Sequence, residues 1–160
     1  MMNQTAGNTS SRQRVEPDFF PPGSKVCFIC LSNQDFSNTL KNIFENNGYL
    51  TTGTRDVETA VQKVRLNQYQ AVVIEAGSDF KTIFHEINSW PGNVRRDINL
   101  IVVGRKAPSM HQQMAFVMGA NYYINYSDAA DMDKLIKQAL DGFHDYYQPW
   151  HQAREVIDAD

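Results

Sequence analysis

Apolar residues along this chain follow two alternating patterns, short compact runs and helical spacing. The runs VCFICL, AVVIE and LIVVG contain almost no polar residue, as expected of strands that are covered on both faces. LTTG and YYIN are shorter segments with strand character. The pattern therefore predicts five strands, at residues 26–31, 50–53, 71–75, 100–104 and 122–125.

Between and after these strands, apolar residues recur every three or four positions, which predicts an amphipathic helix after each strand. Asn47 and Gly48 supply a stop for the first helix, and Gly119 ends the fourth. Ser127 is expected to cap the last helix. The apolar positions are Phe36, Leu40, Ile43 and Phe44; Val57, Ala60, Val61 and Val64; Phe80, Ile83, Phe84 and Ile87; Met110, Met114 and Val117; and Met132, Leu135, Ile136, Ala139, Leu140 and Phe143.

Five β-α units with short connections require right-handed crossovers, and hence a parallel sheet with helices on both faces. We predict an α/β fold, a flavodoxin-like doubly wound (β/α)5 domain at residues 25–143. Residues 1–24 are rich in Asn, Gln, Ser, Thr and Pro and are expected to form a disordered tail, in which Phe19 and Phe20 could dock locally. Residues 144–160 are expected to form a C-terminal helical extension that Pro149 kinks or interrupts.

Composition narrows the classes of function. The chain has 160 residues, 42% of them hydrophobic, which suits one globular domain. A net charge of -3 gives no general attraction to nucleic acid, and Arg95, Arg96, Arg105 and Lys106 are the one local basic cluster. No secretory signal or apolar run of membrane-spanning length occurs, so we expect a cytoplasmic protein without a membrane partner.

Cys27 and Cys30 form a C-x-x-C pair that could indicate redox chemistry, metal binding or a nucleophile. Residues three apart in a strand point to opposite faces, so we expect no disulfide and no shared metal. The stretch VCFICLSNQDFS also resembles the phosphate loop of low-molecular-weight tyrosine phosphatases, with Cys30 at the cysteine position. Phe36 stands where that family has its arginine, which leaves a phosphatase as the weaker interpretation.

Over residues 25–143 the chain resembles the receiver domain of two-component response regulators. The resemblance is carried by MGANYYINYSDAADMDKLIKQAL at 118–140, by Gly48-Tyr49 before the second strand, and by AVVIE ending the third. It implies a site at the carboxyl ends of the strands, where receivers bind a divalent cation and transfer a phosphoryl group to an aspartate. A protein partner in signal transduction is also implied.

Each position of that site differs in this chain. The acidic pair falls on Leu31 and Ser32, or on Ser32 and Asn33 if the loop slips by one residue. The remaining positions of the expected degenerate pocket are Glu75 for the nucleophile, Gly104 for the hydroxyl residue and Tyr126 for the lysine. We therefore expect no metal, no cofactor and no phosphoryl transfer. Glu75 is either a permanent mimic of the phosphorylated state or an ordinary acid at a strand end.

Tyr123 matches the aromatic residue whose rotamer reports phosphorylation in receivers, or is a half-buried strand residue without that role. Aromatic and methionine side chains near the end of the domain suggest a contact surface for a protein partner or a second copy. Its expected members are Met110, His111, Met114, Tyr146, Tyr147 and Trp150. The predicted function is a pseudo-receiver without enzymatic activity. The alternatives are the input domain of a transcriptional regulator or a small-ligand module using Gly77-Ser78 and Gly104-Arg105.

Overall fold

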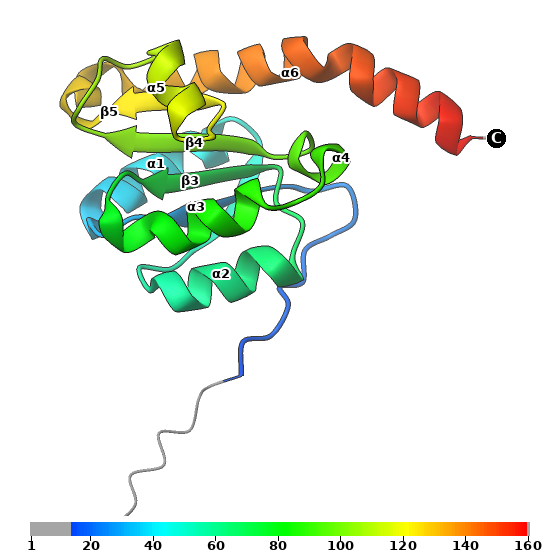
Figure 1. Ribbon diagram of the computed structural model, residues 1–160, viewed down its shortest axis with the longest axis horizontal. Coiled ribbons are helices and arrows are strands. Elements are labelled where there is room, and N and C mark those ends of the chain that lie inside the picture. The colour runs from blue at the N-terminus through cyan, green and yellow to red at the C-terminus, as the bar shows by residue number, and fades with distance from the viewer. Residues whose placement is uncertain (1–13, 160) are drawn as a thin grey trace, which may run out of the picture.

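The computed structural model describes residues 14–159 and contains a five-stranded, fully parallel sheet in the order β2-β1-β3-β4-β5 (Figure 1). This is the predicted flavodoxin-like fold. The chain starts in the middle of the sheet, adds one neighbour on one side, and then crosses β1 to build the other side. The strands are β1 (Lys25–Cys30), β2 (Tyr49–Gly53), β3 (Ala71–Glu75), β4 (Asn99–Gly104) and β5 (Tyr122–Asn125).

Helices cover both faces of the sheet (Figure 1). On one face α1 and α6 pack on the core side chains that include Cys27 and Ile29, and on the other α2 and α3 pack on the set that includes Phe28 and Cys30. The short helix α5 lies over Val102 and Tyr123. The helices are α1 (Gln34–Asn46), α2 (Val57–Leu66), α3 (Lys81–Asn88), α4 (Gly92–Arg95), α5 (Gln112–Val117) and α6 (Met132–Asp158), with single 3-10 segments η1 (Ser78–Phe80) and η2 (Tyr126–Asp131).

Two predicted helix boundaries were wrong. Ser127 does not cap the last helix, because Asn125 accepts a hydrogen bond from the Ser127 backbone N–H (2.9 Å) and opens η2, so that α6 starts only at Met132. Met110 lies before α5, with a positive φ of 65°, because its N–H donates to the Tyr123 carbonyl (2.6 Å) and holds it in the preceding loop. The predicted stop after the first helix is confirmed, with Gly48 at a φ of 86°.

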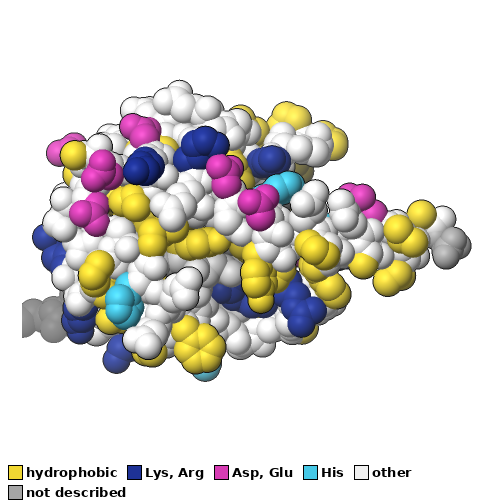
Figure 2. Space-filling model, turned by 90° about the horizontal axis from the view of Figure 1, so that it is seen from above, with side chains coloured by type: hydrophobic (Ala, Val, Ile, Leu, Met, Phe, Trp, Pro, Cys, Tyr) yellow, Lys and Arg dark blue, Asp and Glu magenta, His cyan; other side chains and the backbone are white. Residues whose placement is uncertain are grey.

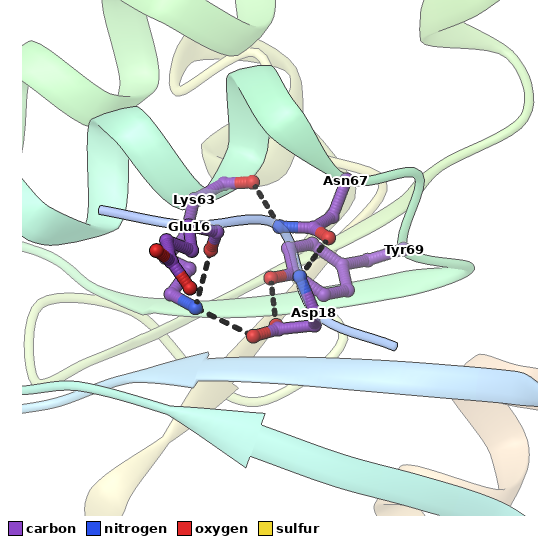
Figure 3. Close-up of polar contacts among 5 residues, drawn as sticks. All are labelled: Glu16, Asp18, Lys63, Asn67 and Tyr69. Carbon is purple, nitrogen blue, oxygen red and sulfur yellow. Dashed lines mark hydrogen bonds and ion pairs between the residues drawn. The ribbon is translucent and has the colours of Figure 1, made fainter. Parts of the chain in front are cut away.

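Part of the N-terminal segment packs on the domain (Figure 3). The Asp18 carboxylate accepts hydrogen bonds from Lys63 (2.5 Å) and from the Tyr69 hydroxyl (2.7 Å), and the Asp18 N–H donates to Asn67 (2.8 Å). Phe20 packs against the core, whereas Phe19 is exposed. The predicted disordered tail therefore does not extend over these residues, because a buried tyrosine hydroxyl and a lysine supply partners for Asp18; residues 1–13 lie outside the described part of the chain.

The last helix passes through Pro149 and continues to Asp158. Figure 1 shows it running past the sheet and bending over its final turns, in agreement with the expected kink but not with an end at the proline. Asp97, just before β4, holds the far half through an ion pair with Arg154 (2.5 Å). The Arg96 guanidinium lies 4.8 Å from the centre of the Trp150 ring. Among the described residues, no helix is both long and apolar enough to span a membrane.

Candidate functional site

Glu75 lies at the carboxyl end of the central strand β3, where the exits of β1 and β5 bring partners to both of its carboxylate oxygens. Oε2 accepts hydrogen bonds from the Ser32 backbone N–H (3.1 Å) and from its hydroxyl (2.6 Å). Oε1 accepts a hydrogen bond from the Tyr126 hydroxyl (2.9 Å). The predicted residues Ser32, Glu75 and Tyr126 therefore meet in one hydrogen-bonded cluster, which we call the Glu75 cluster.

Two large side chains cover the Tyr126 ring. The Phe36 ring, from the first turn of α1, packs against it at 4.7 Å between centroids, and the Arg105 guanidinium lies 4.8 Å from the ring centre. Burial and the hydrogen bond to Glu75 raise the pKa of the Tyr126 hydroxyl. The hydroxyl therefore stays protonated at neutral pH and remains a donor to the carboxylate.

Gly104 and Tyr123 share one space at the end of β4. Tyr123 is 1% exposed, and its hydroxyl accepts a hydrogen bond from the Lys106 N–H (3.0 Å). A Cβ atom added at Gly104 would lie 2.3 Å from the Tyr123 oxygen, closer than van der Waals contact allows. The absence of a side chain at position 104 is therefore what lets the Tyr123 ring lie inward, over the strand, with its hydroxyl on the loop after β4.

The other two expected pocket residues do not point into the Glu75 cluster. Leu31 is buried in the core beneath α1 and α6. Asn33 is the N-cap of α1 and accepts a hydrogen bond from the Phe36 N–H (2.9 Å), and Asp35 follows in the first turn of that helix. Of the positions at which the resemblance puts the acidic pair, Ser32 alone reaches the Glu75 carboxylate. Within residues 14–159, no three His, Cys, Asp or Glu side chains gather closely enough to hold a metal ion.

The two cysteines are free and buried on opposite faces of β1, in agreement with the prediction from their spacing. Burial raises the pKa of the Cys27 thiol, and burial together with the charges of Asp56 and Glu75 raises that of Cys30 to about 12. A phosphatase nucleophile requires the thiolate. The structure therefore gives Cys30 the environment of a core residue rather than that of a nucleophile.

The basic cluster noted in the sequence is divided among separate structural roles. Arg95 donates to the carbonyl oxygens of Ile98 and Gly119 and to the Asn121 side chain, which ties α4 to the segment before β5. Arg96 lies over Trp150, and Arg105 lies over Tyr126. Sequence reasoning missed these partners because, apart from the bond to Ile98, each contact joins segments that are far apart in the chain.

The expected contact residues gather around a groove between α5 and α6, with a volume of about 600 Å³. Met110, His111, Tyr146 and Tyr147 line it, whereas Met114 packs toward the core and Trp150 lies further along α6. Phe116, on the same segment as the expected residues Met110, His111 and Met114, also lines the groove and is 85% exposed. Figure 2, which looks onto this side of the molecule, shows hydrophobic side chains gathered in a band and continuing along α6.

Comparison with solved structures finds the same architecture in receiver domains. The chain is similar to an orphan response regulator of H. pylori (TM-score 0.56, 17% identity, 75% of this chain and 99% of that one). It is also similar to the Francisella response regulator 1452 receiver domain (TM-score 0.59, 15% identity, 77% and 99%). A third match is the receiver domain of a signal transduction histidine kinase from Syntrophus aciditrophicus (TM-score 0.58, 19% identity, 74% and 92%).

No protein-family model matches the sequence, and no curated protein matches it. At these identities the structural matches establish the fold. The chain therefore has the receiver-domain fold. Because one fold can serve many functions, the function of this chain depends on the residues at its strand exits.

Proposed function

We propose that this protein is a pseudo-receiver: a receiver-like signalling domain that does not accept a phosphoryl group and acts by contact with another protein. The observation that carries the proposal is the Glu75 cluster. Both oxygens of the carboxylate at the nucleophile position already accept hydrogen bonds from Ser32 and Tyr126. We also propose that the domain is not an enzyme and works in the cytoplasm of a bacterial cell.

The electrostatics of the Glu75 cluster support this proposal. Phosphoryl transfer to a carboxylate needs cations that neutralise the incoming group, and a divalent ion needs several oxygen ligands, preferably carboxylates. Ser32 contributes a hydroxyl in place of a carboxylate, and Tyr126 contributes a neutral hydroxyl in place of an ammonium group. To bind a metal ion and accept a phosphoryl group, Glu75 would have to give up these hydrogen bonds. The Glu75 cluster offers the ion one carboxylate and offers the phosphoryl group no cation.

The same contacts support a domain that is held in one state. Tyr123 is inward, and the missing side chain at Gly104 removes the hydroxyl group that would couple its rotamer to phosphorylation. Glu75 is joined to the exits of β1 and β5 without any phosphoryl group. We infer that Glu75 acts as a constitutive link between these strand exits, which deepens the phosphomimic interpretation.

The groove between α5 and α6 is the surface that we assign to the protein partner. Its wall carries the exposed Phe116 and Tyr146, and an apolar helix or loop of a partner would bury both. The partner would be a signalling or effector protein, as for receivers in general. The chemistry of the groove supports an aromatic or aliphatic contact segment.

The test combines phosphorylation and partner binding. Incubation with acetyl phosphate and Mg²⁺ should leave the protein unlabelled, and beryllofluoride with Mg²⁺ should leave its melting temperature unchanged, beside an active receiver as positive control. Labelling that disappears in Glu75→Gln would overturn the proposal. Partner capture should be lost in Phe116→Asp and retained in Leu50→Asp, a matched change of an exposed apolar residue on the edge strand β2.

A further inference from the structure

The end of α6 carries two neighbouring apolar side chains that are open to solvent. Val156 is 68% exposed and Ile157 is 73% exposed, although both are large aliphatic residues. Figure 1 shows this end projecting beyond the rest of the domain. Arg154, one turn before Ile157, is held by Asp97, so the projecting turn starts from an anchored position.

An apolar pocket lies beside the root of this projecting turn. It has a volume of about 580 Å³, and Arg154 itself contributes to its rim. Two of its lining residues, Leu66 and Val94, are exposed large aliphatic side chains. We call it the α2–α4 pocket, and its apolar lining consists of Val64, Leu66, Trp90, Pro91, Val94 and Ile98.

We propose that the end of α6 in one copy of this chain inserts into the α2–α4 pocket of a second copy, and the reverse, to form a two-fold symmetric dimer. A two-fold interface requires both complementary features on one surface patch, because each copy uses each feature once. The pocket and the helix end satisfy this requirement, since Arg154 belongs to both.

Charge also favours the α6 end of a second copy as the occupant of the α2–α4 pocket. The last turns of α6 carry Glu155 and Asp158 close to the negative end of the helix dipole, where acidic side chains are unfavourable. Asp158 lies 3.8 Å from Arg154, which compensates part of this charge. Arg65 lies on the rim of the α2–α4 pocket, where its guanidinium pairs with Glu86 (2.7 Å) but its side chain stays 58% exposed and can approach a second carboxylate. In the dimer the arginine of one copy approaches the acidic helix end of the other. The first 13 residues, MMNQTAGNTSSRQ, fit the pocket less well because Met1 and Met2 are their only large apolar side chains.

The dimer is tested by sedimentation velocity of the full chain over a range of concentrations. We expect a concentration-dependent monomer–dimer equilibrium that Ile157→Gln and Leu66→Gln each weaken at least tenfold. Both side chains are exposed in the monomer, so the melting temperature of either variant at low concentration should stay close to that of the parent protein. Phe116→Gln, on the α5–α6 groove, is the matched control and should leave the equilibrium unchanged.

Mixing the two variants distinguishes a reciprocal contact from a general loss of apolar surface. Each variant alone forms a dimer in which both contacts are damaged. A mixed dimer keeps one intact contact, the parent helix end of Leu66→Gln in the parent pocket of Ile157→Gln. Association should therefore be stronger in the mixture than in either variant. A monomer at all concentrations, or a dimer lost only in Phe116→Gln, would overturn the proposal without affecting the phosphorylation test.

Discussion

The residues at the strand exits differ from those that the resemblance to receivers implies, and the differing residues fit one another in size and in hydrogen bonding. Tyr126 is long enough to reach Glu75, and it keeps the proton that makes it a donor because its pKa is raised. Gly104 leaves space for the Tyr123 hydroxyl, which in turn binds the Lys106 N–H. Restoring a single family residue would therefore disturb its neighbours.

The Gly104–Tyr123 pair allows a direct test at this scale. Gly104→Ala should lower the free energy of unfolding by about 1–3 kcal/mol, because its Cβ overlaps the Tyr123 hydroxyl. Tyr123→Phe alone should cost about 0.5–1.5 kcal/mol through the lost hydrogen bond. Urea unfolding of both single variants and of the double variant forms a mutant cycle. The double variant should be more stable than the sum predicts; strict additivity would contradict the packing account.

Two segments outside the β-α units are attached to the domain by a few specific polar contacts. Asp18 holds the N-terminal segment to α2 and to the start of β3 through Lys63 and Tyr69 (Figure 3). Asp97 holds the far half of α6 through Arg154. In both cases one acidic side chain anchors a segment that extends beyond the sheet and the helices packed on it.

Removal of the Asp18 carboxylate should release the N-terminal segment. Asp18→Ala leaves the buried Tyr69 hydroxyl without its acceptor and removes the carboxylate that pairs with Lys63, so we expect a loss of about 1–3 kcal/mol in the free energy of unfolding. Hydrogen exchange should become faster in residues 16–20. Glu16→Ala is the matched control, because Glu16 contacts Lys63 through its backbone carbonyl. Equal effects of the two substitutions would contradict the role of Asp18.

The whole molecule is built around β1, β3 and β4, three strands that are buried on both faces, and the burial of β1 decides the chemistry of its cysteines. Cys27 and Cys30 sit in separate halves of the core, and neither side chain is exposed to solvent. Their reaction with a thiol reagent therefore requires opening of the sheet rather than a local movement.

Thiol reactivity is thus a measure of global opening. With an aromatic disulfide reagent in native buffer, both cysteines should react slowly and at one common rate, which rises with urea in proportion to the unfolded fraction. Protein unfolded in urea supplies the control for full reactivity. Rapid reaction of one thiol in native buffer would show that its half of the core opens separately, and at Cys30 it would revive the nucleophile interpretation.

Sequence reasoning identified the strands and the residues that end or follow them, including Ser32, Glu75 and Tyr126 of the Glu75 cluster. These depend on local periodicity and on the rule that sites lie at the carboxyl ends of parallel strands. It did not predict Phe36 and Arg105 around Tyr126, or the division of the basic cluster. Those contacts depend on how loops from different β-α units approach each other. The cap at Ser127 was wrong for a related reason, since Asn125 can also accept a hydrogen bond at a helix start and lies two residues earlier, at the end of β5.

The sequence by itself determined the parallel sheet, the opposite orientation of the two cysteines and the presence of Leu31, Ser32 and Asn33, none of them acidic, after the first strand. These follow from side-chain period and residue identity alone. Only the tertiary structure decided that Glu75 is bound by Ser32 and Tyr126, that Tyr123 fills the space at Gly104, and that α6 ends beside an apolar pocket. Such contacts join residues distant in sequence, and their geometry arises only when the helices pack on the sheet.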